Sequence, residues 1–417
     1  MTISPAGSRD FRLIWAGTTA GRLGEAVASV ATPLVALTVL DAGPFTVTLL
    51  TAAAWLPWLL IGLPAGAIVD RLAKRPVMIA ADVTSAVAIG SVPVAAALHH
   101  LTVTHLLVAA LVLGAATVFF QSAWAAYLPA VLDEKQLVGA NALLYGSESA
   151  SKVAGPGLAG LLAGAVGAVS GLAVQAGAFA FSAACLLLVR RPERRPPPPL
   201  ERHLWREVGE GIRYVRHDRI IRRLALHGAV SNLPLTGYQA LLVVFLVREI
   251  GLSPGTVGLL LTLTALGGVA GAALVQPLVR RLGDARTLVV CKAGAGPCAL
   301  VVPFTGRGVA LGLFVVASTL VILGITAGNV VSASFRQRWV DPGMLSRVMT
   351  SIQVVNLGTI PLGAVSAGAL ANWVGTRESL AVMTVAYAAS GLMLVLGPLR
   401  GLRDLPSRSL RGAGLPA

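Results

Sequence analysis

The sequence has few charged residues for its length. Asp, Glu, Lys and Arg make up 12% of the 417 residues, whereas apolar residues make up 55% and the mean hydropathy is +0.78. Soluble globular proteins carry roughly 25% charged residues. The shortage of charge excludes an ordinary soluble domain and indicates an integral membrane protein.

Cysteine is scarce as well. Cys185, Cys291 and Cys298 each lie inside an apolar run. Three cysteines so placed exclude a disulfide framework and form no metal-ligand pattern. We expect them to be small buried residues of the core.

Motifs of catalysis are missing too. The sequence has no His-Glu-x-x-His zinc pattern and no Gly-Lys-Ser/Thr phosphate-binding loop. We therefore expect no enzyme activity, no metal and no cofactor. Because there is no ATP site, any energy for transport must come from an ion gradient or from the gradient of the substrate itself.

Long apolar runs are what the sequence does have. A membrane-spanning helix needs about 20 mostly apolar residues. A scan on that basis predicts an all-α integral membrane protein with twelve transmembrane helices, near residues 12–39, 46–69, 77–98, 104–128, 139–167, 170–189, 220–247, 255–279, 287–305, 309–335, 345–371 and 379–399. The first run is too long for a signal peptide and lacks a convincing cleavage site, so we expect it to remain as a helix.

The basic residues indicate an orientation. With the N-terminus inside, the inner segments hold 27 of the 33 Lys and Arg residues, and the outer loops hold only Arg248, Arg307 and Arg377. This asymmetry follows the positive-inside rule. It predicts a multi-pass protein of the cell membrane (the inner membrane in a double-membrane cell) with both termini cytoplasmic. Topology then explains the net charge of +15, and no nucleic-acid partner is needed.

The two halves of the chain resemble each other. At an offset of 210 residues, Gly43–Leu50 aligns with Ser253–Leu260, and Asp70–Pro76 aligns with Arg280–Arg286. Internal repeats of this kind are typical of secondary transporters, whose substrate site lies between the halves near the midplane. We expect two pseudo-symmetric six-helix bundles, with the domains 1–189 (N-terminal bundle), 190–219 (cytoplasmic linker), 220–399 (C-terminal bundle) and 400–417 (cytoplasmic tail).

The linker has two parts. Pro196–Pro199 cannot be helical and is expected to be extended. After it, Leu204, Val208, Ile212 and Val215 recur at helical spacing among arginines. This pattern predicts a basic amphipathic helix on the inner membrane surface. The alternative is a solvated linker that only joins the halves.

One short stretch identifies a superfamily. "GAIVDRLAKRP" between the second and third predicted helices places Gly66, Asp70, Arg71 and Arg75 at fixed spacing. These residues resemble the signature of the major facilitator superfamily, whose members consist of two six-helix bundles that rock about a central cavity. The resemblance implies that the motif joins the halves in one conformation and releases them in the other. Residue by residue, Gly66 permits a close helix approach, Asp70 accepts from a helix N-terminus, and the arginines pair with carboxylates or carbonyls.

The C-terminal copy of this motif is altered. It has Arg280 where Asp70 stands and Asp284 where Lys74 stands. We therefore assign the gate mainly to the N-terminal copy. The alternative is a turn held at the inner side by its basic residues alone.

The fifth predicted helix contains "GSESASKVAGPGLAG". Gly146, Gly155, Pro156 and Gly160 match the helix-5 motif associated with antiporters of this superfamily, whereas Ser151 and Ala159 replace expected glycines. Small residues at this density permit tight helix contact and a proline kink. The alternative is a well-packed helix with no bearing on the direction of transport.

Further stretches resemble one branch of the superfamily, the macrolide-efflux and enterobactin-exporter type of drug:proton antiporter. They are "FRLIWAG", "LGEAVASVATPLVAL", "GEGIRYVRHDRIIRRL" and "DPGMLSRVM". The resemblance implies efflux of a small amphipathic molecule (a drug, a macrolide or a siderophore-like compound), driven by proton entry, and a role in drug resistance. The alternatives are an uptake symporter, a lysophospholipid transporter, or a membrane sensor or assembly partner that does not transport.

Charged residues inside the predicted spans are costly and often functional. Arg22 and Glu25 lie halfway along the first span, and Glu148 and Lys152 lie at a similar depth in the fifth. Their i,i+3 and i,i+4 spacing predicts an ion pair on each helix. We expect proton coupling at these residues, with Glu25 as the carrier and Glu148 as second choice. The alternative is two local pairs that only offset their burial cost.

Asp82 lies near the inner end of the third span, and at the repeat offset it corresponds to Lys292. We expect it to support the gating turn by pairing with an arginine there. The alternative is a role in transport.

Other polar residues of the spans are candidates for lining the substrate cavity, which the resemblance places at the first, fourth, seventh and tenth helices. They are Gln121, Trp124, Asn232, Tyr238, Gln239, Asn329, Gln353 and Asn356. The alternatives are helix-packing contacts for the amides and the interfacial aromatic belt for Trp124 and Tyr238. The expected partners are a small-molecule substrate, protons and the lipid bilayer, with the protein acting as a monomer.

Overall fold

The computed structural model describes residues 8–132, 134–190, 193, 204–396 and 401–406, and these are almost wholly helical. The predicted proline run Pro196–Pro199 and the tail beyond residue 406 lie outside them. The helices are α1 (Arg9–Thr38), α2 (Pro44–Arg71), α3 (Lys74–Ala97), α4 (Val103–Val131), α5 (Glu134–Ala165), α6 (Val169–Leu188), α7 (Leu204–His217), α8 (Arg219–Val244), α9 (Pro254–Leu282), α10 (Asp284–Ala299), α11 (Val309–Trp339), α12 (Pro342–Val374) and α13 (Thr376–Val395). A π-helical turn, Phe245–Glu249, extends α8, and a 3₁₀ turn, Val302–Phe304, follows α10.

Each of the twelve predicted spans corresponds to one long helix, α1–α6 and α8–α13. Ten of these helices are long and apolar enough to cross a membrane. The other two, α1 and α5, carry the charged pairs that the sequence places inside the membrane. The predicted twelve-helix membrane fold is confirmed.

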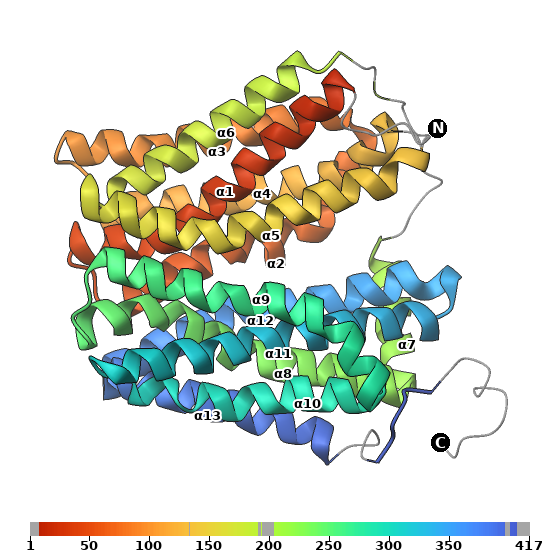
Figure 1. Ribbon diagram of the computed structural model, residues 1–417. Coiled ribbons are helices and arrows are strands. Elements are labelled where there is room, and N and C mark those ends of the chain that lie inside the picture. Colours follow the sequence, from red (N-terminus) through yellow and green to blue (C-terminus); the bar gives the residue numbers. More distant parts are fainter. Residues whose placement is uncertain (1–7, 133, 191–192, 194–203, 397–400, 407–417) are drawn as a thin grey trace. The chain divides into compact units, whose positions relative to one another are not determined.

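The chain divides into two compact units. One comprises Met1–Arg202 with Gly251–Thr262, and the other comprises His203–Ile250 with Leu263–Ala417. In the first unit α1 packs against α5 and α6, α3 packs against α4 and α6, and α2 packs against α4 (Figure 1). Glycines bring α1 close to α6, because a Cβ at Gly17 or Gly24 would meet α6 atoms at 3.0 and 2.9 Å.

The second unit repeats this arrangement. Here α8 packs against α12 and α13, and α10 packs against α11 and α13. These contacts correspond to those of α1 with α5 and α6, and of α3 with α4 and α6. The weak sequence repeat is therefore a repeat of helix packing, and the two bundles are pseudo-symmetric.

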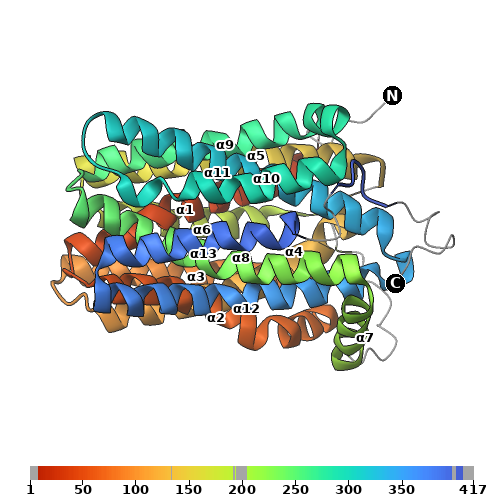
Figure 2. The same cartoon turned by 90° about the horizontal axis from the view of Figure 1, so that it is seen from below.

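Helix α7 confirms the predicted amphipathic helix and adds a packing partner. It runs across the direction of the other helices of its unit and packs against α12 and α8 (Figure 2). Gly211 permits close contact, since a Cβ there would clash with the carbonyl oxygen of Arg347. The Arg347 guanidinium also pairs with Glu210, and Tyr214 and Val215 pack onto the buried core of the unit. The apolar face of α7 is thus at least partly covered by protein.

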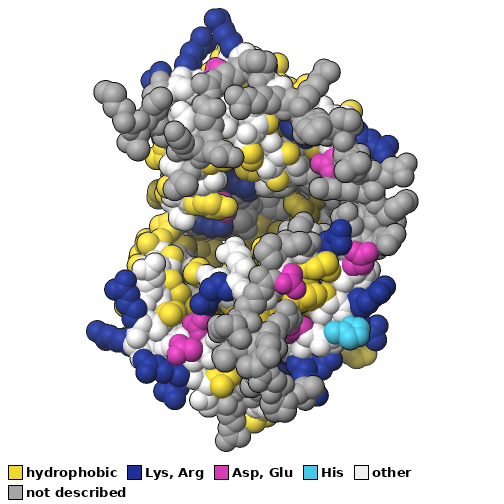
Figure 3. Space-filling model, turned by 90° about the vertical axis from the view of Figure 1, so that its right-hand side faces the viewer, with side chains coloured by type: hydrophobic (Ala, Val, Ile, Leu, Met, Phe, Trp, Pro, Cys, Tyr) yellow, Lys and Arg dark blue, Asp and Glu magenta, His cyan; other side chains and the backbone are white. Residues whose placement is uncertain are grey.

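Basic side chains stand out at one end of the helices. Figure 3 looks onto the end at which α1 begins, and Lys and Arg side chains are prominent on its described surface. The predicted inner turn of the N-terminal unit, with Arg71 and Arg75, lies between the end of α2 and the start of α3. The basic residues of this turn therefore lie at the end of the N-terminal unit at which α1 begins.

Candidate functional site

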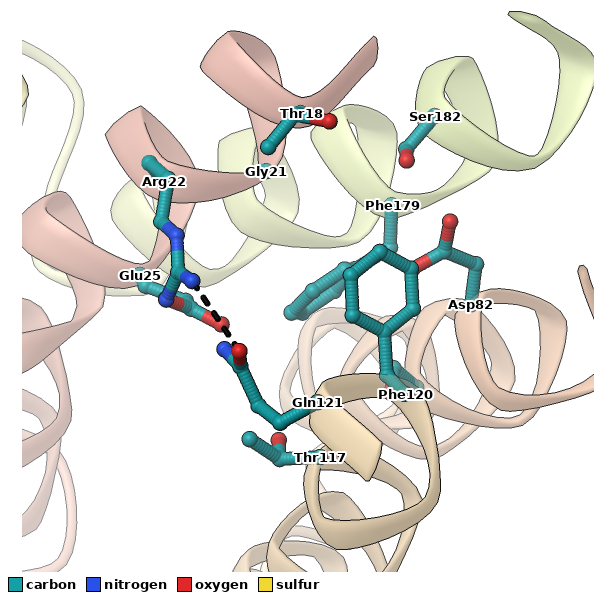
Figure 4. A pocket seen from close by; sticks show the side chains of 11 residues that line it. Thr18, Gly21, Arg22, Glu25, Asp82, Thr117, Phe120, Gln121, Phe179 and Ser182 are labelled. Carbon is teal, nitrogen blue, oxygen red and sulfur yellow. Dashed lines mark hydrogen bonds and ion pairs between the residues drawn. The ribbon is translucent and has the colours of Figure 1, made fainter. Parts of the chain in front are cut away.

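The first charged pair lies on α1 and faces α4. The Arg22 Nη1 and Glu25 Oε2 atoms are 3.2 Å apart, and Arg22 Nη2 donates to Gln121 Oε1 at 3.2 Å. The predicted ion pair is present, because residues three apart share one face of a helix. The side chains of Arg22 and Glu25 are 25% and 35% exposed. Figure 4 shows the three side chains converging from α1 and α4.

These side chains line a small pocket inside the N-terminal unit. Its walls come from α1, α3, α4 and α6 and include Thr18, Ser85, Thr117, Phe120, Phe179 and Ser182. The cavity volume open to the centre of a water molecule is about 20 Å³. A single water needs roughly 10–15 Å³ by this measure. The pocket therefore has room for one or two waters and none for a drug-sized molecule.

Asp82 opens onto the same pocket from α3. Asp82 is 3% exposed, and the Ser182 hydroxyl on α6 lies within hydrogen-bonding reach of the Asp82 carboxyl. The expected pairing with an arginine of the turn is not found among the described residues. The carboxyl points into the bundle instead, because Asp82 stands two helical turns beyond the start of α3 at Lys74.

The second charged pair lies on α5. Lys152 Nζ contacts Glu148 Oε1 at 2.7 Å, so the predicted i,i+4 pair is also present. The Lys152 side chain is 71% exposed, whereas that of Glu148 is 28% exposed. The charges of Glu148 and Lys152 act electrostatically on Glu25. The two pairs thus belong to one electrostatic system on neighbouring helices.

A larger pocket adjoins the first one and shares Thr18, Arg22 and Gln121 with it. Its cavity volume is about 170 Å³ by the same measure, and its other walls are Thr19, Trp124, Asn141, Leu144, Tyr145, Ser147 and Glu148. The Trp124 ring stacks on Phe120 with centroids 6.4 Å apart. Of the predicted cavity residues, Gln121 and Trp124 are therefore brought together beside the charged pairs.

The gating motif is organised around a residue outside the signature. Lys74 is 2% exposed, and its amino group donates to the carbonyl oxygens of Val69, Asp70 and Leu72 at 2.8, 3.0 and 2.9 Å. These carbonyls end α2, where a positive charge is favourable. Lys74 therefore holds the turn between α2 and α3.

Arg75 and Glu193 complete this turn. The Arg75 guanidinium donates to the carbonyls of Leu186 and Leu187 at the end of α6, at 2.8 and 2.9 Å, which confirms the predicted pairing with carbonyls. The Glu193 carboxylate accepts from the backbone N–H of Lys74 and of Arg75 and so caps α3. No sequence pattern points to Glu193, because 119 residues separate it from Lys74.

The other residues of the motif are exposed or have open space around them. Asp70 and Arg71 are exposed, and a Cβ at Gly66 would meet no described atom within 4 Å. The close helix approach expected at Gly66, and a helix N-terminus donating to Asp70, are absent from the described residues.

The C-terminal copy of the turn is capped in a similar way. Asp284 accepts from Arg338 Nη2 at 2.7 Å, and its own backbone N–H donates to the Asp404 carboxylate at 3.3 Å. The segment after the last helix of each unit therefore supplies a carboxylate to the third helix, Glu193 in one unit and Asp404 in the other.

The helix-5 motif has two close contacts. A Cβ at Gly155 would clash with the Ala26 Cβ on α1, next to Glu25. A Cβ at Gly160 would lie 2.8 Å from the Gly258 Cα, in the segment Gly251–Thr262 that groups with this unit. Gly146 has open space around it. Pro156 lies inside α5, and the departures Ser151 and Ala159 are buried.

The predicted cavity residues of the C-terminal unit divide into packed and exposed ones. Asn232 donates to the Asn356 carbonyl at 2.8 Å, which is a contact between α8 and α12. Tyr238 is 4% exposed, so it belongs to the interior of the unit and not to an interfacial belt. Asn329 accepts from Lys292 Nζ at 2.8 Å. Gln239 and Gln353 are exposed.

Metal-ligating side chains are scattered through the described part of the chain. These residues contain no group of three or more His, Cys, Asp or Glu side chains that could hold an ion. The polar chemistry of that part consists of ion pairs, amides and hydroxyls.

Comparison with known proteins finds one family model over nearly the whole chain, described as "Transmembrane secretion effector", at residues 1–411. The multidrug efflux pump Tap of Mycolicibacterium fortuitum is 25% identical over 95% of this chain and 97% of its own length. Macrolide efflux protein A of Streptococcus pyogenes is 21% identical over 88% of this chain and 91% of its own.

Solved structures show the same fold. The nucleoside transporter NupG has a TM-score of 0.75 at 8% identity, with 93% of this chain and 98% of its own covered. A bacterial homologue of the iron transporter ferroportin, in an inward-facing state, has a TM-score of 0.74 at 17% identity, with 93% and 98% covered. At these identities the likeness establishes the architecture alone.

Proposed function

Because the chain belongs to the transmembrane secretion effector family of the major facilitator superfamily, we propose that this transporter is a proton-coupled exporter of small amphipathic molecules. Membership makes it a multi-pass membrane transporter and not an enzyme. Efflux pumps among its relatives support the direction of transport and the substrate class.

The observation that carries the proton coupling is the Arg22–Glu25–Gln121 group beside a water-sized pocket. An ionised Glu25 is stabilised by the Arg22 guanidinium, with which it shares an ion pair. Protonation of Glu25 removes that attraction and leaves Arg22 bonded to Gln121 alone. Protonation therefore frees the Arg22 guanidinium from its partner on α1 and leaves the one on α4, and such a charge-dependent change of contacts can couple the proton to a conformational cycle.

Substrate and proton compete in this scheme. The larger pocket, with Trp124 and Tyr145 in its wall, shares Arg22 with the proton pocket. A substrate that binds only when Glu25 is ionised displaces the proton from this carboxyl, and a proton on Glu25 disfavours the substrate in turn. Export of one then drives entry of the other.

Alternating access uses the turn between α2 and α3. Lys74, Arg75 and Glu193 fix the turn, while Asp70 stands exposed for a partner in the other conformation. The basic residues at this end support a cytoplasmic location for the turn and for both termini.

The test is proton movement in inside-out vesicles that contain the protein. An acid interior is imposed, and macrolides, siderophores, dyes and lysolipids are added one at a time while lumenal pH is followed by fluorescence. We expect one compound to alkalinise the lumen in wild type and in Glu148→Gln vesicles, and not in Glu25→Gln vesicles. Substrate uptake without a pH change would contradict proton antiport. Normal pumping by Glu25→Gln with loss in Glu148→Gln would move the carrier to α5.

The gate has its own test. We expect Asp70→Asn to fold normally and to slow the transport cycle, since an exposed carboxylate adds nothing to the packing of the described turn. Unchanged turnover in the purified variant would remove Asp70 from the gate.

A further inference from the structure

Asp82 is a buried carboxyl that the scheme above does not use. Its exposure of 3% contrasts with the partly exposed Glu25, and its Oδ2 atom has no hydrogen-bond partner among the described residues. The Ser182 hydroxyl is within reach of the carboxyl. One carboxyl oxygen of Asp82 thus lies inside the bundle without a hydrogen-bond donor among the described residues.

An ionised carboxylate in such a place is unfavourable. Buried charges in proteins are paired or fully hydrogen-bonded, and otherwise the group neutralises itself. Arg22 is the one cation among the residues that line the pocket, and it is engaged with Glu25 and Gln121. A neutral, protonated acid fits the surroundings of Asp82 better than a carboxylate.

The groups that face Asp82 are few. Across the pocket, α1 brings Arg22 and Glu25, and the Glu25 charge acts on Asp82. Helix α4 brings Thr117 and Gln121, and α6 brings Ser182, with Cys185 one turn further along; neither helix adds an ionised group to the pocket. Asp82 therefore responds to one charged pair only.

We propose that Asp82 is a second proton-binding residue of the transporter, which exchanges a proton with Glu25 through the pocket that both line. The inference rests on the proposed proton coupling. In the exchange, the O–H bond of the Asp82 carboxyl breaks, a water in the pocket relays the proton, and an O–H bond forms on the Glu25 carboxylate. The negative charge moves to Asp82, and Arg22 remains in the pocket to balance it.

The phenyl rings of Phe120 and Phe179 lie between the two carboxyl groups (Figure 4). Apolar rings exclude water from a direct path, so the exchange depends on a water passing them. The proton then moves when the helices shift, and not at rest.

The test is infrared spectroscopy of the purified full-length protein, which detects the C=O stretch of protonated carboxyl groups. We expect a protonated-acid band in the wild type at neutral pH that is lost in Asp82→Asn and kept in Glu25→Gln and Glu148→Gln. A band that survives in Asp82→Asn, or is lost only in Glu25→Gln, would overturn the proposal. If Asp82→Asn does not fold, Ser182→Ala is used: the band should shift in frequency, and an unshifted band counts against Asp82.

A transport measurement separates this proposal from the one it rests on. In proteoliposomes, Asp82→Asn should still export substrate while the ratio of protons moved to substrate exported falls, because the proton held at Asp82 can no longer pass to Glu25. An unchanged ratio in a folded variant would contradict the second site. If no compound moves protons even in the wild type, the proton-coupling proposal fails, and the infrared band still reports whether Asp82 holds a proton.

Discussion

The two units repeat one helix arrangement but carry an acidic residue in one unit and a basic residue in the other at the same place. Asp82 and Lys292 lie at the same distance from the first residues of α3 and α10, Lys74 and Asp284. The Asp82 carboxyl is buried near Ser182, whereas the Lys292 amino group reaches the Asn329 side chain at 2.8 Å. The two repeats share the packing of their helices, but the charged and polar residues inside them differ.

The same contrast holds for the spans as a whole. In the N-terminal unit Glu25, Asp82 and Glu148 lie well inside α1, α3 and α5. Along the spans α8–α13, all of which are described, acidic residues occur only at or beside helix ends: Asp218, Glu249, Asp284, Asp341 and Glu378. A proton carrier needs an acid whose charge can be lost inside the membrane. The comparison therefore favours the N-terminal unit as the site of the proposed proton chemistry.

The largest expected effect on folding comes from the turn before the third span, where Lys74 stands in one unit and Asp284 in the other. Lys74→Met should lower the free energy of unfolding by about 3 kcal/mol, because three backbone carbonyls lose a charged donor. At the corresponding position of the other repeat, Asp284→Asn should cost less than about 1 kcal/mol, since its partner Arg338 is 65% exposed and an Asn Oδ1 can still accept from the backbone N–H of Leu405. Thermal unfolding of both variants in detergent checks this order, and equal losses would break the comparison.

Tight helix packing is the next point to test. Gly155→Leu should destabilise the protein by about 1–3 kcal/mol through overpacking against Ala26, and it should disturb Glu25 on the same turn of α1. Gly146→Leu on the same helix is the control, since open space surrounds Gly146. Unfolding temperature and proton flux are measured for both. Similar behaviour of the two variants would mean that the α1–α5 contact is not tight.

The carboxylate caps allow a finer comparison. Glu193→Ala should cost about 1–2 kcal/mol, since its carboxylate accepts from two backbone N–H groups at the start of α3. Asp404→Ala should cost about 0.5–1 kcal/mol, because its bond to the first backbone N–H of α10 is longer, at 3.3 Å. Hydrogen exchange at the first turns of α3 and α10 measures each cap separately. Faster exchange at α10 in Glu193→Ala would show that the caps do not act locally.

The smallest effect is expected at the signature glycine. Gly66→Ala should leave the free energy of unfolding unchanged or raise it by up to about 1 kcal/mol, because a Cβ at this position meets no described atom within 4 Å and Ala favours a helix over Gly. A normal unfolding temperature with slowed transport would show that Gly66 serves a conformation other than the one described. A lowered unfolding temperature would contradict the open surroundings seen here.

Local patterns in the sequence predict the fold well. Hydropathy locates all twelve spans, and helical spacing locates α7 and both ion pairs, Arg22–Glu25 and Glu148–Lys152. Each of these features depends on residues close together in the chain. The stretch "DPGMLSRVM" at the start of α12 stands out in the sequence only through its resemblance to the branch, and the structure joins it to α7 through Glu210 and Arg347.

Contacts between distant residues cannot be predicted in the same way. Nothing near Lys74 in the sequence indicates that the Glu193 carboxylate, 119 residues away, caps the backbone at the start of α3. The position of Asp82 along the chain suggests a role at the turn, and the structure corrects this. Its direction into the bundle depends on how α3 rotates against α4 and α6, and the sequence pattern of one helix does not determine that rotation.

The most direct test of the account compares one variant from each unit. Proton flux driven by an exported substrate is measured in proteoliposomes with wild type, Glu25→Gln and Lys292→Gln at equal protein content. We expect Glu25→Gln to abolish the flux and Lys292→Gln to retain it. Loss of proton flux in Lys292→Gln with normal flux in Glu25→Gln would place the proton chemistry in the C-terminal unit and contradict the account.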